Sequence, residues 1–227
     1  MKILSLASLL VGLAVTVQAA DPLDDIFDLD DLRVKIAPWL PYATVLHQGR
    51  EVILMRHQDP GNTIASRFAV TSRDCPPFCV QPMKVHAEVE TLGELELIDY
   101  LQRKSDGDDS ILVIDSRTSE WTASGTIPGS VNLPWVRLDP AQTEVSDIAD
   151  ILRFDFGAVQ LDELWDFSNA KTLVFFCNGP WCGQSPTNIR ALLTLGYPPE
   201  KLKWYRGGLQ SWEQFGFTTV IDQPAGH

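Results

Sequence analysis

The sequence predicts an α/β domain over about residues 84–222, in which helices flank a mostly parallel sheet, with a small β-rich extension before it. Two observations predict this class. The runs ILVID at 111–115 and TLVFFC at 172–177 are short and almost continuously apolar, which is typical of strands buried on both faces. Each run is followed by a helical pattern of apolar residues, and strands that alternate with helices form parallel sheets covered on both sides.

The first helix of this domain is expected shortly after residue 90. Thr91 and Glu94 have the spacing of a capping box, and Leu95, Ile98 and Leu101 then fall on one helical face. The sequence DGDD that follows breaks the helix before the first apolar strand.

The second helix is expected after the second apolar strand. Ser185 and Pro186 form a suitable N-cap and first helical residue, and an apolar stripe of Ile189, Leu192 and Leu193 follows. Residues 203–206 then predict a third strand.

The N-terminus has the features of a secretory signal peptide at residues 1–19. Lys2 precedes an apolar run that is short for a membrane span, and small residues at Val17 and Ala19 mark a cleavage site. We therefore expect an exported, periplasmic protein, with a single N-terminal anchor as the alternative. No other stretch reaches transmembrane length, so an integral membrane protein is not expected.

The formal net charge of −12 argues against nucleic acids and anionic membranes as partners. Six of the eleven residues at 21–31 are aspartate, which predicts a solvated leader. An acidic surface does not attract an anionic substrate, so any anion site must be built locally.

Residues 20–83 are expected to form the acidic leader and the β-rich extension. Strand-like runs within 43–56 flank Gln48 and Gly49, which suit a hairpin turn, and residues 64–72 predict a further strand. Cys75 and Cys79 follow, separated by Pro-Pro-Phe. In an exported chain a local disulfide is the favoured interpretation, and a second redox pair or half of a four-thiol metal site are the alternatives.

Cys177 is the candidate nucleophile. It ends an apolar strand, a Gly/Pro-rich loop follows, and a helix begins near Pro186. Unpaired loop N–H groups and the positive end of the helix dipole stabilise a thiolate at such a position, and the same N–H groups can hold an oxyanion.

Three ordered motifs resemble the rhodanese family. They are the loop after Cys177, the segment 114–134 with Asp-x-Arg and Ile-Pro-Gly, and the segment 204–217 with Gly-Gly-x-x-x-Trp. The resemblance implies a sulfurtransferase that takes sulfane sulfur from a small anion such as thiosulfate. A Cys177 persulfide would pass the sulfur to cyanide or a thiol, without a metal or other cofactor, and a redox protein is a further candidate partner.

The resemblance also assigns the remaining site residues. Asp115 and Arg117 are candidates for supporting the site, with Arg117 expected as a structural ion-pair partner. The loop that would hold the donor consists, besides the cysteines, of Asn178, Gly179, Pro180, Trp181, Gly183, Gln184 and Ser185.

The sequence departs from the family pattern in this loop. The loop is longer than in many single-domain rhodaneses, it contains no Lys or Arg, and it holds a second cysteine, Cys182. Cys182 is a candidate resolving thiol, half of a soft-metal pair, or a bystander. A thiol–disulfide or anion reductase that uses both cysteines, or a non-enzymatic binding module, are therefore the rival functions.

The sequence also predicts the roles of several side chains around the loop. Thr126 replaces the common histidine of the Ile-Pro-Gly motif and is expected to matter for packing. Trp121, Trp135 and Trp212 are expected in the core, and Trp181 is expected to wall the pocket.

Overall fold

The computed structural model describes residues 29–74, 80–162 and 164–221. Its centre is a five-stranded sheet in the order β3-β9-β8-β4-β5, in which all neighbouring strands are parallel. This topology confirms the predicted α/β class. The strands of the sheet are β3 (Glu90–Leu92), β4 (Ile111–Asp115), β5 (Val131–Asn132), β8 (Thr172–Phe176) and β9 (Leu202–Tyr205).

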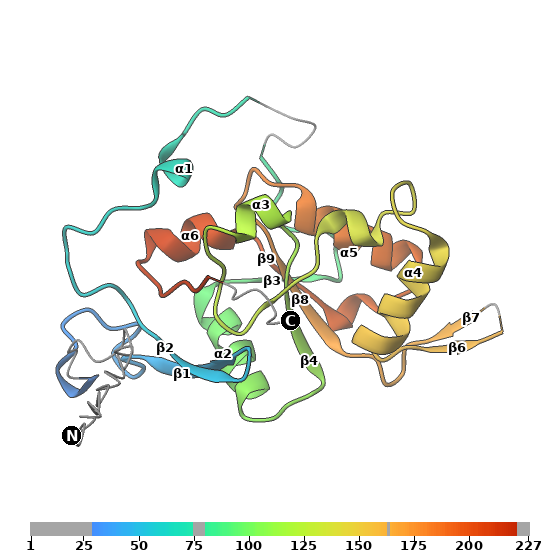
Figure 1. Cartoon of the computed structure of the whole chain (residues 1–227), viewed down its shortest axis with the longest axis horizontal. Coiled ribbons are helices and arrows are strands. Elements are labelled where there is room, and N and C mark those ends of the chain that lie inside the picture. The colour runs from blue at the N-terminus through green and yellow to red at the C-terminus, as the bar shows by residue number, and fades with distance from the viewer. Residues whose placement is uncertain (1–28, 75–79, 163, 222–227) are drawn as a thin grey trace, which may run out of the picture.

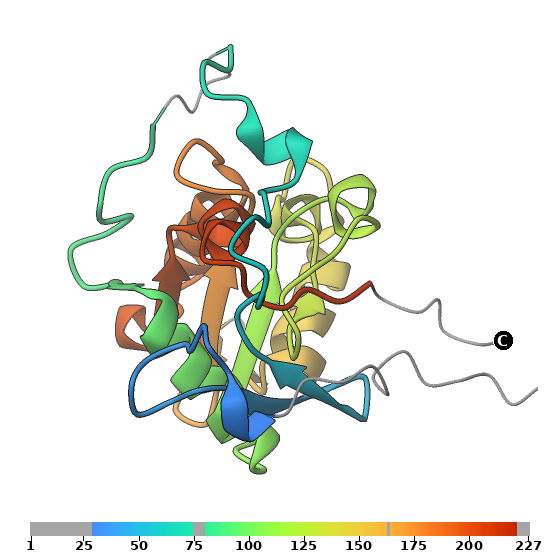
Figure 2. The same cartoon turned by 90° about the vertical axis from the view of Figure 1, so that its left-hand side faces the viewer.

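Helices cover both faces of this sheet (Figures 1 and 2). The helices and helical turns are η1 (Leu29–Asp31), α1 (Ser66–Ala69), α2 (Glu94–Ser105), α3 (Ser119–Thr122), η2 (Trp135–Leu138), α4 (Val145–Asp150), the π-helical η3 (Ile151–Asp155), α5 (Gln184–Thr194), η4 (Pro199–Lys201) and α6 (Gly208–Gln214).

Two apolar clusters follow from the alternation of side chains along the central strands. On β8, Val174 and Phe176 pack with α2 and α6, whereas Leu173 and Phe175 pack with α4, η3 and α5. All four side chains are fully buried. A strand that faces apolar helices on both sides must be apolar throughout, which explains the continuous runs in the sequence.

The N-terminal extension contributes the predicted hairpin, formed by β1 (Ala43–His47) and β2 (Arg50–Leu54). Gln48 and Gly49 at its turn both have positive φ, 49° and 74°, as the tight turn between two twisted strands requires. The hairpin lies against α2, where the Leu46 N–H donates to Ser105 Oγ at 2.8 Å. The extension thus packs on the same face of the sheet as α2 and α6 (Figure 1).

Two local predictions were wrong. Within 64–72 the structure has the short helix α1 instead of a strand, because a helical turn buries Phe68 while Ser66 is exposed. On α2, Leu97 is buried in place of Leu95, which is 42% exposed.

The predicted helix starts were also shifted. Helix α2 begins after Gly93, whose N–H donates to Glu96 Oε2 at 3.1 Å, so Thr91 belongs to β3 and caps nothing. Helix α5 begins at Gln184, one residue before the expected N-cap Ser185. The Ser185 hydroxyl therefore does not cap this helix.

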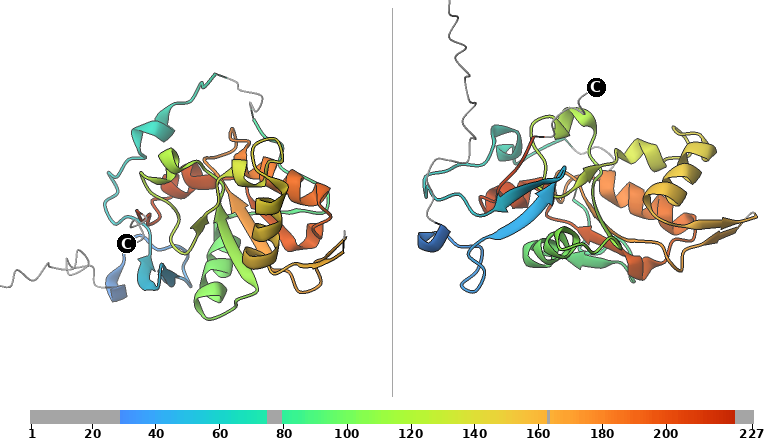
Figure 3. Two further views of the ribbon diagram at one scale, coloured as in Figure 1. Left: turned by 45° about the vertical axis from the view of Figure 1, so that its right-hand side comes forward. Right: turned by 60° about the horizontal axis from the view of Figure 1, so that its bottom comes forward.

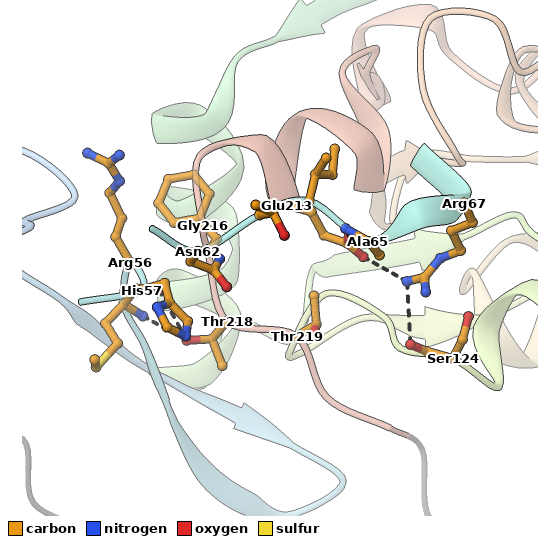
Figure 4. Close-up of a pocket in the computed structure, with 14 residues that line it drawn as sticks. Arg56, His57, Asn62, Ala65, Arg67, Ser124, Glu213, Gly216, Thr218 and Thr219 are labelled. Atoms are coloured by element: carbon orange, nitrogen blue, oxygen red, sulfur yellow. Dashed lines mark hydrogen bonds and ion pairs between the residues drawn. The ribbon is translucent and has the colours of Figure 1, made fainter. Parts of the chain in front are cut away.

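The extension and the C-terminal segment meet at a polar junction (Figure 4). Arg67 of α1 donates to Glu213 of α6 at 2.7 Å and to the Ser124 carbonyl oxygen at 3.5 Å. Nearby, the Thr218 N–H donates to the Met55 carbonyl oxygen at 3.0 Å. These contacts fix the path of the chain from β2 towards the C-terminal end of the sheet.

A two-stranded ribbon projects from the opposite side of the molecule (Figure 3). It consists of β6 (Val159–Leu161) and β7 (Leu164–Asp166), which pair antiparallel. Among the described residues, no helix has the length and apolar character needed to cross a membrane.

Candidate active site

Cys177 immediately follows β8, at the carboxyl end of the central strand. The chain beyond β9 returns directly against it, since the Leu209 N–H donates to the Cys177 carbonyl oxygen at 3.0 Å. Gly208 makes this approach possible: its φ is +57°, and a Cβ there would lie 2.6 Å from the Gly179 nitrogen. The Gly-Gly motif therefore holds the cysteine loop in place.

The Cys177 sulfur is buried among hydrogen-bond donors. The residue is 2% exposed, and the Ser185 hydroxyl donates to its Sγ at 3.1 Å. The thiol of Cys182 and the N–H groups of Ser185 and Gly179 also donate to this sulfur. Burial alone raises the pKa of a thiol, but these four donors prevail and lower the pKa of Cys177 to about 7.

The pKa of Cys182 shifts in the opposite direction. Its hydrogen bond to Cys177, its burial and the charge of the Cys177 thiolate raise the pKa of the Cys182 thiol. Both cysteines are free. In the reduced protein Cys177 is thus the thiol that ionises first, while Cys182 stays protonated beside it.

The pKa of Cys177 gives a pH-dependent prediction. The thiolate reacts with iodoacetamide, so the alkylation rate should rise with pH and reach half its maximum near pH 7, the pKa of the folded protein. In urea the midpoint should return to about 8.5, the ordinary value of a cysteine. The measurement uses a variant that keeps only Cys177 and Cys182. A folded-state midpoint at or above the unfolded one would contradict the donor arrangement.

The rest of the predicted loop closes around the two sulfurs. The Cys182 N–H donates to the Gly179 carbonyl oxygen at 2.9 Å, which makes a tight turn through Pro180 and Trp181. The Gln184 Oε1 lies 3.6 Å from Cys182 Sγ. The fold therefore places all of the predicted loop residues in one compact turn at the start of α5.

Asp115 and Arg117 form a fully buried ion pair beside this loop. Arg117 Nη2 donates to Asp115 Oδ2 at 2.6 Å and to the Gly125 carbonyl oxygen at 2.7 Å. The Thr126 hydroxyl donates to the same carboxylate oxygen at 2.7 Å. The sequence predicted only a packing role for Thr126, and the structure adds this hydrogen bond to Asp115. The pair fixes the segment after β4, and Asp115 lies opposite Phe176 in the sheet.

The extension reaches this site, which the sequence did not predict. The Arg73 guanidinium stacks on the Trp181 ring, 4.1 Å from its centroid, and the Gln81 N–H donates to the Pro180 carbonyl oxygen at 2.7 Å. Phe68 stacks on Trp121 with centroids 6.2 Å apart. A cation thus lies against a loop that itself contains no Lys or Arg.

Three tryptophans surround a cavity of about 260 Å³ next to the loop. Trp181 lines it as predicted, and Trp121 and Trp135, which were expected in the core, line it as well. Of the three tryptophans expected in the core, only Trp212 has no exposed surface. Cys182 lines this cavity. The predicted pair Cys75 and Cys79 lies outside the described residues, and its disulfide stays a prediction.

A model of the rhodanese-like domain family matches residues 97–215, which is more than half of the chain. The chain belongs to this family. A comparison with curated proteins finds no match.

Solved structures with a similar fold include several proteins. The human single-domain sulfurtransferase is 25% identical, with 57% of this chain and 97% of that chain covered and a TM-score of 0.36. A Rhodopseudomonas palustris protein described as a possible tyrosine phosphatase is 22% identical, with coverage of 61% and 88% and a TM-score of 0.41. The As-Sb reductase of Leishmania major is 22% identical, with coverage of 56% and 79% and a TM-score of 0.39.

Proposed function

We propose that the protein is a sulfurtransferase that carries sulfane sulfur as a persulfide on Cys177. Membership of the rhodanese-like family supports the class of reaction. The observation that carries the proposal is the Cys177 sulfur with four hydrogen-bond donors around it and a pKa of about 7. At pH 7 about half of such a thiol is ionised, and the thiolate is a good nucleophile.

In the first step the Cys177 thiolate attacks the outer sulfur of a donor such as thiosulfate. A new S–S bond forms to Cys177, the S–S bond of thiosulfate breaks, and its electron pair leaves with sulfite. In the second step cyanide or a thiol attacks the outer sulfur of the persulfide, and the electron pair returns to Cys177. The same donors that stabilise the resting thiolate stabilise this leaving group.

The test of this function is thiocyanate formation from thiosulfate and cyanide by the purified protein, with sulfite release measured in parallel. The proposal expects equal amounts of both products over many turnovers. The assay is then repeated with mercaptopyruvate as the donor in place of thiosulfate, and with a thiol as the acceptor in place of cyanide. Turnover with none of these donors would contradict the proposal.

We further propose that Cys182 resolves the persulfide when no acceptor arrives. Its sulfur would attack Cys177 Sγ, an intraloop disulfide would form, and the outer sulfur would leave as hydrosulfide with the thiol proton. The proximity of the two cysteines supports this role, since Cys177 Sγ lies 3.5 Å from the Cys182 carbonyl oxygen. A raised pKa keeps Cys182 protonated in the reduced protein, so it does not compete with Cys177 for the donor.

Cys182→Ser should then lengthen the lifetime of the persulfide and stop sulfide release. The serine hydroxyl keeps a hydrogen-bond donor beside Cys177, so the first step should stay within about threefold of the wild-type rate. The measurement is intact mass and sulfide release over time after excess donor has been removed. Equal rates of persulfide decay in the wild type and in Cys182→Ser would contradict the resolving role.

The Cys182→Ser variant also distinguishes a sulfurtransferase from the rival enzyme class, a dithiol reductase. That class is favoured by the pairing of one acidic and one protonated thiol at the site. For a reductase, Cys182→Ser should eliminate turnover of an oxidised anion such as arsenate and spare one stoichiometric reaction. Continued turnover of thiosulfate by the variant supports the sulfurtransferase.

We also infer that residues 1–19 are removed on export to the periplasm. This leaves the acidic leader and extension (20–83) and the rhodanese-like domain (84–222). The signal-like N-terminus supports the inference. N-terminal sequencing of protein from the periplasmic fraction tests it, and an intact Met1 in cytoplasmic protein would contradict it.

A further inference from the structure

The cavity beside Cys182 has a composition that the proposed reaction does not explain. Trp121, Trp135 and Trp181 make its walls, and none of the described residues that line it is Lys, Arg, Asp or Glu. Asn178, Gln184 and Thr187 supply uncharged polar groups to the lining. The indole walls favour an apolar or aromatic group.

The tryptophans are held as fixed walls by the neighbouring segments. Phe68 stacks on Trp121, Arg73 covers one face of Trp181, and the Trp181 Nε1–H donates to Gln210 Oε1 at 2.8 Å. Trp121 and Trp181 also contact each other, with centroids 6.2 Å apart. Because both rings are braced from outside the cavity, the site is formed before a ligand enters.

Asn178 connects the cavity lining to Cys182. It lines the cavity and is 2% exposed, and its Nδ2 donates to Cys182 Sγ at 3.9 Å. This contact helps to hold the side chain of Cys182, which also lines the cavity.

Charge narrows the ligand further. With no cationic lining residue, an anionic group gains no partner in the cavity, and with no acidic lining residue a cationic group gains none either. A volume of about 260 Å³ is below the range of roughly 300–1,000 Å³ that is typical of drug-sized ligand sites. The ligand is therefore neutral, compact and apolar.

We propose that this cavity binds the organic body of the sulfur acceptor, a neutral thiol that carries an aromatic ring. The inference rests on the proposed sulfur transfer and names the substrate of its second half. The acceptor sulfur attacks the outer sulfur of the Cys177 persulfide, the S–S bond of the persulfide breaks, and its electron pair returns to Cys177. The thiol proton of the acceptor moves to the transferred sulfur, which leaves as an organic hydropersulfide. Cys182 lines the cavity, and its carbonyl oxygen lies 3.5 Å from Cys177 Sγ, so the cavity is adjacent to the reacting cysteine.

The experiment isolates this second half. The protein is loaded with thiosulfate, the excess is removed, and persulfide loss is followed by intact mass after addition of benzyl mercaptan or 2-mercaptoethanol. These two thiols have similar acidity but differ in the ring. The wild type should be discharged at least about tenfold faster by benzyl mercaptan at equal low concentration, since only its ring is buried in the cavity.

Variants at Trp135, which is only half-buried, test the cavity itself. Trp135→Ala should reduce the preference for benzyl mercaptan by about tenfold, and Trp135→Phe should restore most of it. The matched control is Trp39→Ala, an indole that is 77% exposed and does not line the cavity, and it should keep the full preference.

Several results would overturn the inference. Discharge of the wild type at equal rates by both thiols would do so, as would a full preference in Trp135→Ala. Faster discharge by the anionic 3-mercaptopropionate or the cationic cysteamine would contradict the neutral ligand. If thiosulfate loads no sulfur at all, the proposed function itself fails, and this inference fails with it.

Discussion

Cys177→Ser is expected to abolish sulfur transfer, with a loss of at least roughly a thousandfold in turnover. A serine hydroxyl stays protonated at neutral pH, whereas the Cys177 thiol ionises with a pKa of about 7. The measurement is thiocyanate formation from thiosulfate and cyanide, at equal protein concentrations.

The substitution should leave the fold intact, because serine is nearly isosteric and can accept the hydrogen bond from Ser185. Thermal unfolding therefore serves as the control for this variant. Activity of a folded Cys177→Ser protein near the wild-type level would show that another residue carries the sulfur.

Arg117→Met is expected to be the most destabilising substitution near the site. It leaves the Asp115 carboxylate fully buried without its cation, which costs about 3–5 kcal/mol of unfolding free energy. The carboxylate would keep only the hydrogen bonds from the Arg117 N–H and the Thr126 hydroxyl. For a domain of this size the melting temperature should fall by roughly 6–20 °C.

The matched control is Arg153→Met, which removes a pair with Asp150 whose side chains are 41% and 59% exposed. An exposed pair contributes about 0–1 kcal/mol, so this variant should melt close to the wild type. Urea unfolding of the two variants gives the comparison. Similar free energies of unfolding for both would contradict the structural role of the buried pair.

The central strands could be predicted from sequence almost residue by residue. The runs 111–115 and 172–177 correspond to β4 and β8, because a strand packed on both faces leaves a continuous apolar signature. The position of Cys177 at the end of β8 followed from the same run. Elements on one face were harder to place, and α1 was predicted as a strand because four residues carry too little periodicity.

The sequence predicts which residues form the cysteine loop, but not how their side chains are arranged around Cys177. Its residues are consecutive in the sequence, so they were predicted together. The contact of the Ser185 hydroxyl with Cys177 was not predicted, because the helix start was placed two residues late. Arg73 is more than a hundred residues away from Trp181 along the chain, and Phe68 is about fifty residues away from Trp121, so no local pattern indicates these contacts. The aromatic cavity therefore appears only in the folded chain.

The central claim is that Cys177 accepts a sulfur atom. Its most direct test is the intact mass of the reduced protein before and after incubation with thiosulfate, with peptide mapping of the product. We expect the mass of one sulfur atom to be gained, located on Cys177 and lost again on addition of cyanide. An unchanged mass, or sulfur located on Cys182 alone, would contradict the account.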